Sequence, residues 1–222
     1  GNVRENVASA SLPTFHSGSA SGSIAGAFSG GSDGTVNHPI TFNENISNTN
    51  TQGFDLSVDA VKEQYTKALN LLSNADEYDF NLLLLPGIIR SLSNHTSLIS
   101  KAIDVCENRG DAFVVVDSVP YNTSTLSDIT DQAKAIDSNY AATYWPWIQV
   151  PDLQTGQNVW VPPSVAVVGV YSYNDKVAHP WFAPAGLSRG GITTAIQAER
   201  KLTNNQRDTL YEKNVNPIAT FA

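Results

Sequence analysis

The stretch FNLLLLPGIIRSLSNHTSLISKAIDVCENRGDAFVVVD, residues 80–117, decides the fold. Residues 80–85 form a short, nearly unbroken apolar run that ends at Pro86-Gly87, a pattern typical of a central parallel strand buried on both faces. Apolar residues then recur at helical spacing over residues 98–106, before Arg109 and Gly110 end the predicted helix. Residues 113–116 predict a second buried strand, with Asp117 just past it. Strand, helix and strand in this order predict an α/β fold with a right-handed parallel crossover.

The regions on either side extend this alternation. Upstream, residues 58–72 predict an amphipathic helix with Ser57 as its cap. Downstream, Thr125 and Asp128 resemble a capping box that opens a helix. Residues 142–150 predict a third strand, which Pro146 places at an edge or a bulge. Residues 164–170 are compatible with a strand or a helix, and residues 192–202 and 204–211 predict further helices. The sequence therefore predicts a central, mostly parallel sheet flanked by helices.

Residues 1–53 differ from the rest of the chain because Gly, Ser, Asn and Thr dominate them. Residues 24–28 and 39–42 interrupt this composition with apolar side chains. We expect an extended, turn-rich segment with two short strands, packed on the body or on a neighbouring chain. This gives two regions, the segment 1–53 and the α/β domain 54–222.

Composition narrows the class of protein. The chain has 222 residues, of which 41% are apolar and 15% charged, and its net charge is -8. The 13 Lys and Arg residues are dispersed, which argues against a nucleic-acid partner and against a membrane surface. The apolar run over residues 80–89 is much shorter than the roughly 20 residues that cross a bilayer. The chain has no methionine and starts with Gly1, so we expect an internal piece of a longer protein.

One serine lies in a motif known from hydrolases. Residues Gly186-Leu187-Ser188-Arg189-Gly190 match G-x-S-x-G, the nucleophile elbow that follows a strand and precedes a helix. Prolines at 180 and 184 argue against a strand here, and no histidine follows His179. We interpret the motif as a glycine-rich turn, and a serine hydrolase of subtilisin-like or esterase type stays the alternative.

Asp117 is the better candidate by position, because open α/β sheets bind ligands beyond the carboxyl ends of their strands. A catalytic triad would pair it with a histidine and a nucleophile. His95 is the only histidine near the predicted sheet, since His16 and His38 lie in the Gly/Ser-rich segment and His179 lies beside a proline. We otherwise interpret Asp117 as a cap or turn acceptor for residues 118–121.

Metal, phosphate and thiol chemistry find little support. The four histidines are far apart, and Asp76, Glu77 and Asp79 fit a solvated face. Residues 30–34, Gly-Gly-Ser-Asp-Gly, lack the Lys-Ser/Thr of a phosphate-binding loop. Cys106, the single cysteine, lies among apolar residues and is interpreted as a buried structural thiol. We therefore predict no catalytic, cofactor-binding or metal-binding residue, no cofactor and no enzymatic activity.

All four tryptophans, Trp145, Trp147, Trp160 and Trp181, lie between residues 140 and 190. Three of them fall within a short span that also holds Pro, Ile and Val. This favours a role in a core or a subunit interface, with a sugar-binding platform as the alternative.

Several blocks of sequence, in a fixed order, resemble the contractile tail sheath proteins of bacteriophages and related injection machines. They are Gly30-Gly31-Ser32-Asp33-Gly34, Leu85-Pro86-Gly87, Ala141-Ala142-Thr143-Tyr144-Trp145-Pro146-Trp147, Val161-Pro162-Pro163-Ser164-Val165-Ala166-Val167-Val168-Gly169-Val170-Tyr171 with Asn174-Asp175, Trp181-Phe182-Ala183-Pro184-Ala185-Gly186 with Arg189-Gly190, and Asn216-Pro217-Ile218. Outside residues 30–34, the resemblance covers residues 54–221.

The resemblance implies a subtilisin-like α/β domain without protease activity, because fold does not carry function. It implies a structural subunit that polymerises as helical rings around a tail tube and contracts to drive the tube into the host envelope. The implied partners are other sheath subunits and, in the full-length protein, the tail tube protein and the baseplate. The implied location is the virion, with assembly in the host cytoplasm. The N-terminal arm and C-terminal domain of sheath proteins are missing here, so we expect this chain alone to be soluble and not to polymerise.

Overall fold

A computed structural model describes residue 42, residues 44–153 and residues 155–221. All of them belong to one unit of the chain. The two short strands predicted around residues 24–28 and 39–42, the Gly-Gly-Ser-Asp-Gly turn, His16 and His38 fall outside the described residues, apart from residue 42. The division of the chain between residues 53 and 54 stays a prediction.

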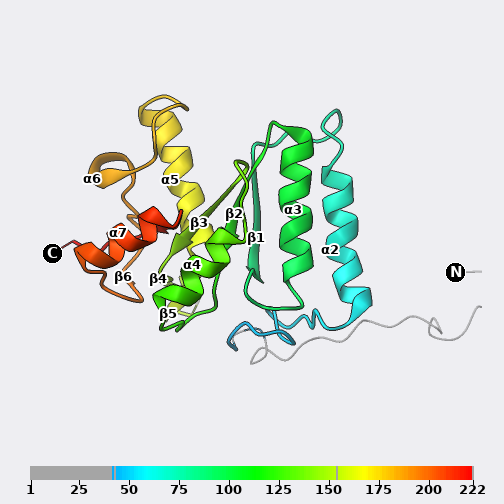
Figure 1. The fold of residues 1–222 in the computed structure, drawn as a ribbon, viewed down its shortest axis with the longest axis horizontal. Coiled ribbons are helices and arrows are strands. Elements are labelled where there is room, and N and C mark those ends of the chain that lie inside the picture. The colour runs from blue at the N-terminus through cyan, green and yellow to red at the C-terminus, as the bar shows by residue number, and fades with distance from the viewer. Residues whose placement is uncertain (1–41, 43, 154, 222) are drawn as a thin grey trace, which may run out of the picture. The chain divides into compact units, whose positions relative to one another are not determined.

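The centre of the described unit is a four-stranded sheet made of β1 (Leu82–Ile89), β2 (Phe113–Asp117), β3 (Ala141–Trp145) and β7 (Asn216–Pro217). The strand order is β1-β2-β3-β7, and every neighbouring pair is parallel. Helices cover both faces: α2 (Asp59–Leu72) and α3 (Thr96–Arg109) lie on one side of β1 and β2, and α5 (Pro163–Val177) lies on the other (Figure 1). The predicted α/β class with a parallel sheet is confirmed, while the likeness to a subtilisin-like fold stays a prediction.

The first strand lies at the end of this sheet order, so the prediction of a central strand is wrong. β1 also continues through Pro86 to Ile89, with an irregular register between Leu84 and Ile89. A proline is tolerated there because a strand paired on one side only can lose one N–H donor. Gly87 permits the bend, since its φ of +85° lies in the left-handed region that side chains disfavour.

The first core cluster joins β1 and β2 to α2 and α3. Leu83 and Leu85 alternate with more exposed neighbours, and both belong to this cluster together with Ile88. Gly110 ends α3 in the left-handed conformation, as predicted. The guanidinium of Arg109 donates to the carbonyls of Leu72 and Tyr78, both at 2.8 Å, and so ties the end of α3 to the chain after α2.

Two helix caps predicted from the sequence, at Ser57 and at Thr125, do not form as predicted. The hydroxyl of Ser57 donates to Oδ1 of Asp55 at 2.6 Å, and Val58 is the residue that precedes α2. The carboxylate of Asp55 competes for Ser57 because it accepts from both its hydroxyl and its N–H. α4 (Leu126–Lys134) starts where predicted, but the Thr125 hydroxyl bonds the Asp128 carboxylate instead of the backbone, so the predicted capping box is absent.

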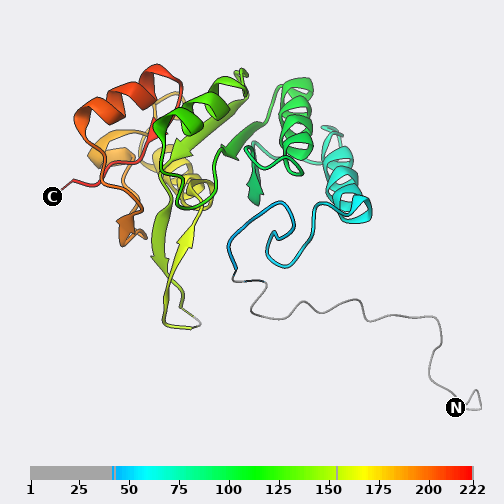
Figure 2. The ribbon, with the colours of Figure 1, turned by 60° about the horizontal axis from the view of Figure 1, so that its bottom comes forward.

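Residues 142–150 form two strands in two different sheets, so the single strand with Pro146 at an edge or bulge is wrong. β3 ends at Trp145 and lies between β2 and β7, whereas β4 (Ile148–Pro151) starts a second, antiparallel sheet. β4 pairs with β5 (Asn158–Val161) and with β6 (Gln197–Ala198). Figure 2 shows β4 and β5 projecting from the body. Pro146 therefore lies where the chain leaves one sheet for the other.

The C-terminal part of the chain settles two further predictions. Residues 164–170 are helical within α5. Residues 192–202 are not a helix. The N–H groups of Ile196 and Glu199 donate to the carbonyls of Gln149 and Trp147, both at 2.8 Å, and β6 forms there and pairs with β4. After the one-turn helix α6 (Gly186–Arg189), α7 (Asn204–Glu212) forms as expected, with a complete capping box of Thr203 and Gln206. No helix in the described part of the chain is long and apolar enough to cross a bilayer.

Candidate functional site

Asp117 lies at the carboxyl end of β2, where the sequence places a ligand site, but its carboxylate is already bonded within the protein. Oδ1 accepts the N–H of Ser164 at 3.1 Å, and Oδ2 accepts the Ser164 hydroxyl at 2.6 Å. Pro163 has no N–H to offer, so the N–H of Ser164 is the first free donor of α5. Asp117 is thus a cap, as the alternative interpretation held, although for α5 and not for residues 118–121.

The cap is enclosed. Asp117 is 3% exposed and Ser164 is 0% exposed. Burial raises the pKa of Asp117 to about 7, and the two bonds from Ser164 oppose this shift. Ser164 was missed as a partner because nothing in its local sequence links it to a strand end 47 residues away. A carboxyl group without access to solvent fits an architectural role better than a ligand site.

His95, the histidine that the sequence places near the sheet, bonds to the backbone and not to Asp117. Its Nδ1 accepts the N–H of Ile89 at 3.0 Å, so the neutral ring carries its proton on Nε2. Nε2 then donates to the carbonyl of Ser47 at 3.1 Å and also contacts the Thr51 hydroxyl at 3.3 Å. Burial lowers the pKa of His95. With both nitrogens occupied and 0% exposure, His95 fastens the chain before α2 onto β1.

Ser188 does not lie in a nucleophile elbow. The G-x-S-x-G residues form the single turn α6, and no strand is described between residues 178 and 186. Ser188 is exposed, and no contact joins it to a histidine or a carboxylate in the described residues. Gly190 is required by packing, because a Cβ there would lie 2.7 Å from the Cα of Ala185. The motif is a tight turn, in agreement with the sequence interpretation.

The remaining chemical candidates are equally inert in their surroundings. Cys106 is 0% exposed, and burial raises the pKa of its thiol to about 11, so it is a poor nucleophile at neutral pH. Asp76, Glu77 and Asp79 are exposed. Among the described residues, no group of three His, Cys, Asp or Glu side chains is arranged to hold a metal ion.

The four tryptophans divide between core and surface. Trp145 and Trp147 are 1% and 4% exposed, and Nε1 of Trp147 donates to the carbonyl of Val119 at 2.9 Å. Trp160 is half-buried, with its ring 5.1 Å from that of Tyr121. Trp181 is 77% exposed. The predicted core role therefore holds for two of them, and Trp181 is available to a partner.

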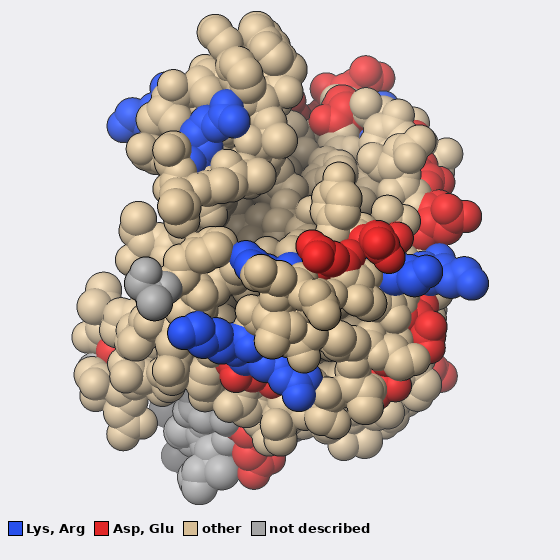
Figure 3. Space-filling view, turned by 60° about the vertical axis from the view of Figure 1, so that its left-hand side comes forward, with Lys and Arg blue, Asp and Glu red and all other residues tan. Residues whose placement is uncertain are grey.

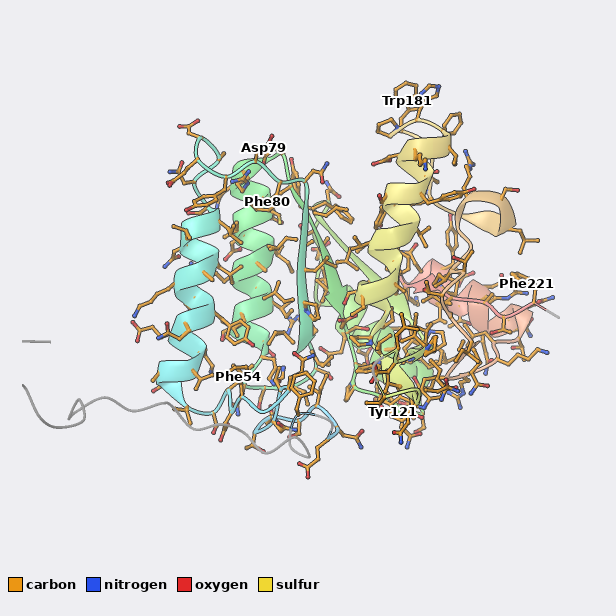
Figure 4. All side chains as sticks on the ribbon, turned by 180° about the vertical axis from the view of Figure 1, so that it is seen from behind. Phe54, Asp79, Phe80, Tyr121, Trp181 and Phe221 are labelled. Carbon is orange, nitrogen blue, oxygen red and sulfur yellow. The ribbon has the colours of Figure 1, made fainter. Side chains whose placement is uncertain are left out.

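Trp181 belongs to a protruding apolar surface at the end of α5, which we call the knob. Its members are Tyr173, Val177, His179, Trp181, Phe182 and Leu187, and all of them are exposed. Figure 4 shows Trp181 beyond the end of α5, pointing away from the body. The His179 ring stacks on Trp181 at 4.4 Å and on Phe182 at 5.8 Å, and the Arg189 guanidinium lies 4.8 Å from the Phe182 ring centre.

A concave surface lies beside the start of β3. An open cleft of about 1120 Å³ is bordered by the ends of α4 and α7 and by the start of β3. Asp131, Asp137 and Glu212 line it together with Lys134 and Lys213. Thr143, only 2% exposed, also lines the cleft, and its hydroxyl has no hydrogen-bond partner.

Comparison with known families shows which family the chain belongs to. Residues 60–222 match the family model described as the phage tail sheath protein central domain. The chain belongs to the phage tail sheath family. It is 36% identical over 87 residues to a tail sheath protein of Vibrio phage KVP40, a match that covers 39% of this chain and 12% of that protein. It is 31% identical over 96 residues to a tail sheath protein of Enterobacteria phage T4, covering 43% of this chain and 14% of that protein.

The family assignment agrees with the state of the candidate residues. In this sheath-family chain Asp117, His95 and Cys106 are enclosed, and Ser188 is exposed with no base beside it in the described part of the chain. The matched stretches are a small part of the two curated relatives, 12% and 14% of their lengths. Two surfaces of the described residues that are open to a partner are the knob and the cleft.

Proposed function

We propose that this chain is a structural part of a contractile phage tail sheath. In this proposal its subunits polymerise as helical rings around the tail tube, and contraction of the rings drives the tube into the host envelope. Its partners are other sheath subunits and, in the full-length protein, the tail tube protein and the baseplate. It acts in the virion after assembly in the host cytoplasm.

The observation that carries the proposal is the match of residues 60–222 to the sheath central domain. Support also comes from the enclosed polar groups, since Asp117 and His95 already have protein partners at hydrogen-bond distance. A sheath domain needs a stiff body, because a subunit transmits force only if it moves as a unit. The parallel sheet with helices on both faces supplies such a body.

Contraction makes a physical demand on the subunit. Each copy has to pack in two arrangements that differ by a few kcal/mol, and many copies sum these differences into mechanical work. A contact of this kind joins different surfaces on the two copies and does not close on itself, which generates a helix. An enzymatic role is not part of the proposal, because the hydroxyl and carboxylate of the Ser164–Asp117 pair are enclosed and the exposed Ser188 has no base among the described residues.

The experiment is electron microscopy of the full-length sheath protein that carries this sequence. Under assembly conditions we expect tubes with helical striations, and in purified virions antibodies against residues 60–222 should decorate the outer layer of the tail. Soluble monomers under all conditions, or decoration of the head or fibres only, would contradict the proposal.

A further inference from the structure

The knob is a preorganised binding element. Asn174, itself 1% exposed, donates from its side-chain amide to the carbonyl of Phe182 at 3.0 Å and so holds the loop against α5. The N–H of Phe182 donates to the carbonyl of His179 at 2.9 Å, which closes a turn under Trp181. Rings that are already stacked and anchored lose little conformational entropy when a partner covers them.

The composition of the knob is that of an interface centre. Trp181 is 77% exposed and Leu187 is 80% exposed, although both are large apolar side chains. Contiguous exposed apolar surface of this kind marks interaction sites. Trp, Tyr and Arg dominate the binding energy of interfaces, and Trp181, Tyr173 and Arg189 occur together here.

The knob and the cleft differ in the sign of their net charge. Lys176 and Arg189 flank the knob, with Asp175 as the acidic residue beside them, so the positive charges are in excess. Figure 3 shows basic side chains on the lobe that projects at the top and a hollow below it with acidic and basic groups along its lower rim. The cleft carries three carboxylates, Asp131, Asp137 and Glu212, against two lysines. Complementary charge of this kind orients two surfaces and speeds their encounter.

We propose that the knob of one copy of this chain docks into the cleft of a second copy. The inference rests on the proposed function and names one contact between neighbouring subunits of the polymer. The knob and the cleft share no residue, so one copy can use both at once. Such a contact is heterologous, and repeated from copy to copy it produces an open helical array.

The first test uses the full-length sheath protein with Trp181→Ala. Loss of an aromatic anchor at the centre of an interface should raise the concentration needed for assembly by about thirtyfold. Leu71→Ala removes an apolar side chain that is 53% exposed on α2, outside both surfaces, and should leave assembly unchanged. Equal effects of the two substitutions, or none from Trp181→Ala, would overturn the inference.

The second test identifies the partner surface. Full-length proteins with Leu187→Cys and with Asn139→Cys, a residue that lines the cleft, are mixed, assembled and oxidised. We expect a disulfide-linked dimer in the mixture and much less with either variant alone, because the contact joins two different surfaces. Replacing Leu187→Cys by Leu71→Cys should abolish the product. Cross-linking that is equal in all mixtures would contradict docking in the cleft.

Two outcomes separate this inference from the proposed function. If the unmodified full-length protein does not assemble, the proposed function fails and the inference fails with it. If it assembles and Trp181→Ala does so equally well, only the inference fails.

A third outcome concerns the stability of the monomer. If Trp181→Ala strongly lowers the urea concentration at which the monomer unfolds, another part of the same chain covers the knob, and docking between copies is wrong.

Discussion

The carboxyl end of the sheet and the segment after α5, residues 178–190, contain similar residue types that differ in their exposure to solvent. Near the sheet, Trp145 and Ser164 are at most 1% exposed, and Asp117 accepts two hydrogen bonds from Ser164. In the segment after α5, Trp181 is 77% exposed and Ser188 is exposed as well. The comparison shows that residue type alone does not assign a role. Enclosed groups stabilise the domain, whereas exposed groups are available to partners.

The largest effect should separate the two tryptophans. Trp145→Ala removes a fully enclosed ring from the cluster formed with Leu210 and Val215 and should cost about 4 kcal/mol of unfolding free energy. Trp181→Ala removes an exposed ring, and we expect a change within about 0.5 kcal/mol. Urea unfolding followed by circular dichroism measures both. Similar losses would break the comparison, because Trp181 would then be a core residue.

The cap on α5 should give the next largest effect. Asp117→Ala leaves the N–H and hydroxyl of Ser164 without an acceptor in an enclosed site, which should cost about 2 to 3 kcal/mol. The matched control is Asp175→Ala, an exposed residue near the other end of the same helix, with an expected change below about 0.5 kcal/mol. An Asp117→Ala protein as stable as the control would show that the cap contributes nothing.

Local patterns in the sequence predicted most of the sheet and the position of Asp117. Helical spacing over residues 98–106 and the apolar runs at 80–85 and 113–116 are properties of adjacent residues, so they specify the strand-helix-strand unit. The errors involve partners far apart in the chain. Apolar spacing predicts a helix over residues 192–202, whereas Ile196 and Glu199 bond to carbonyls far earlier in the chain, and such pairing leaves no local pattern.

The candidate site shows the same limit. Asp117 could be recognised at the end of a strand, but Ser164 could not be recognised as its partner. The aromatic and proline content around Trp145 and Trp181 is similar, so the sequence did not tell the core ring from the exposed one. Trp145 is enclosed by a core cluster that includes Ile129 of α4 and Leu210 of α7, and these residues are not adjacent to it in the sequence. The exposure of the knob is therefore seen in the three-dimensional structure and not in the sequence.

Titration of Asp117 should make the stability of the domain depend on pH. Its pKa rises from 3.8 in an unfolded chain to about 7 in the fold. Between these values the folded form holds one proton more than the unfolded chain, so the unfolding free energy falls as the pH rises, by up to about 1.4 kcal/mol per pH unit. Below the lower value and above the upper value this group contributes no slope.

The measurement is urea unfolding at a series of pH values, comparing the unmodified protein with Asp117→Asn. Other carboxylates contribute to both curves alike, so the difference isolates Asp117. Asparagine keeps an oxygen acceptor for the Ser164 N–H without a charge, and its stability should exceed that of the unmodified protein above pH 7. Parallel curves would show that Asp117 titrates as it does in the unfolded chain.

The smallest expected effect is at Ser188, where the comparison predicts no reaction at all. A serine-directed phosphonate labels a hydroxyl only if a base removes its proton, and Ser188 has no such partner among the described residues. Mass spectrometry should therefore find an unlabelled peptide around residues 186–190, with Ser188→Ala as the control. Stoichiometric labelling that disappears in the control would break the comparison between the two regions, since the segment after α5 would then hold a reactive group. The enclosed Ser164 offers the internal reference, because it has a carboxylate partner but 0% exposure and should stay unlabelled until the domain unfolds.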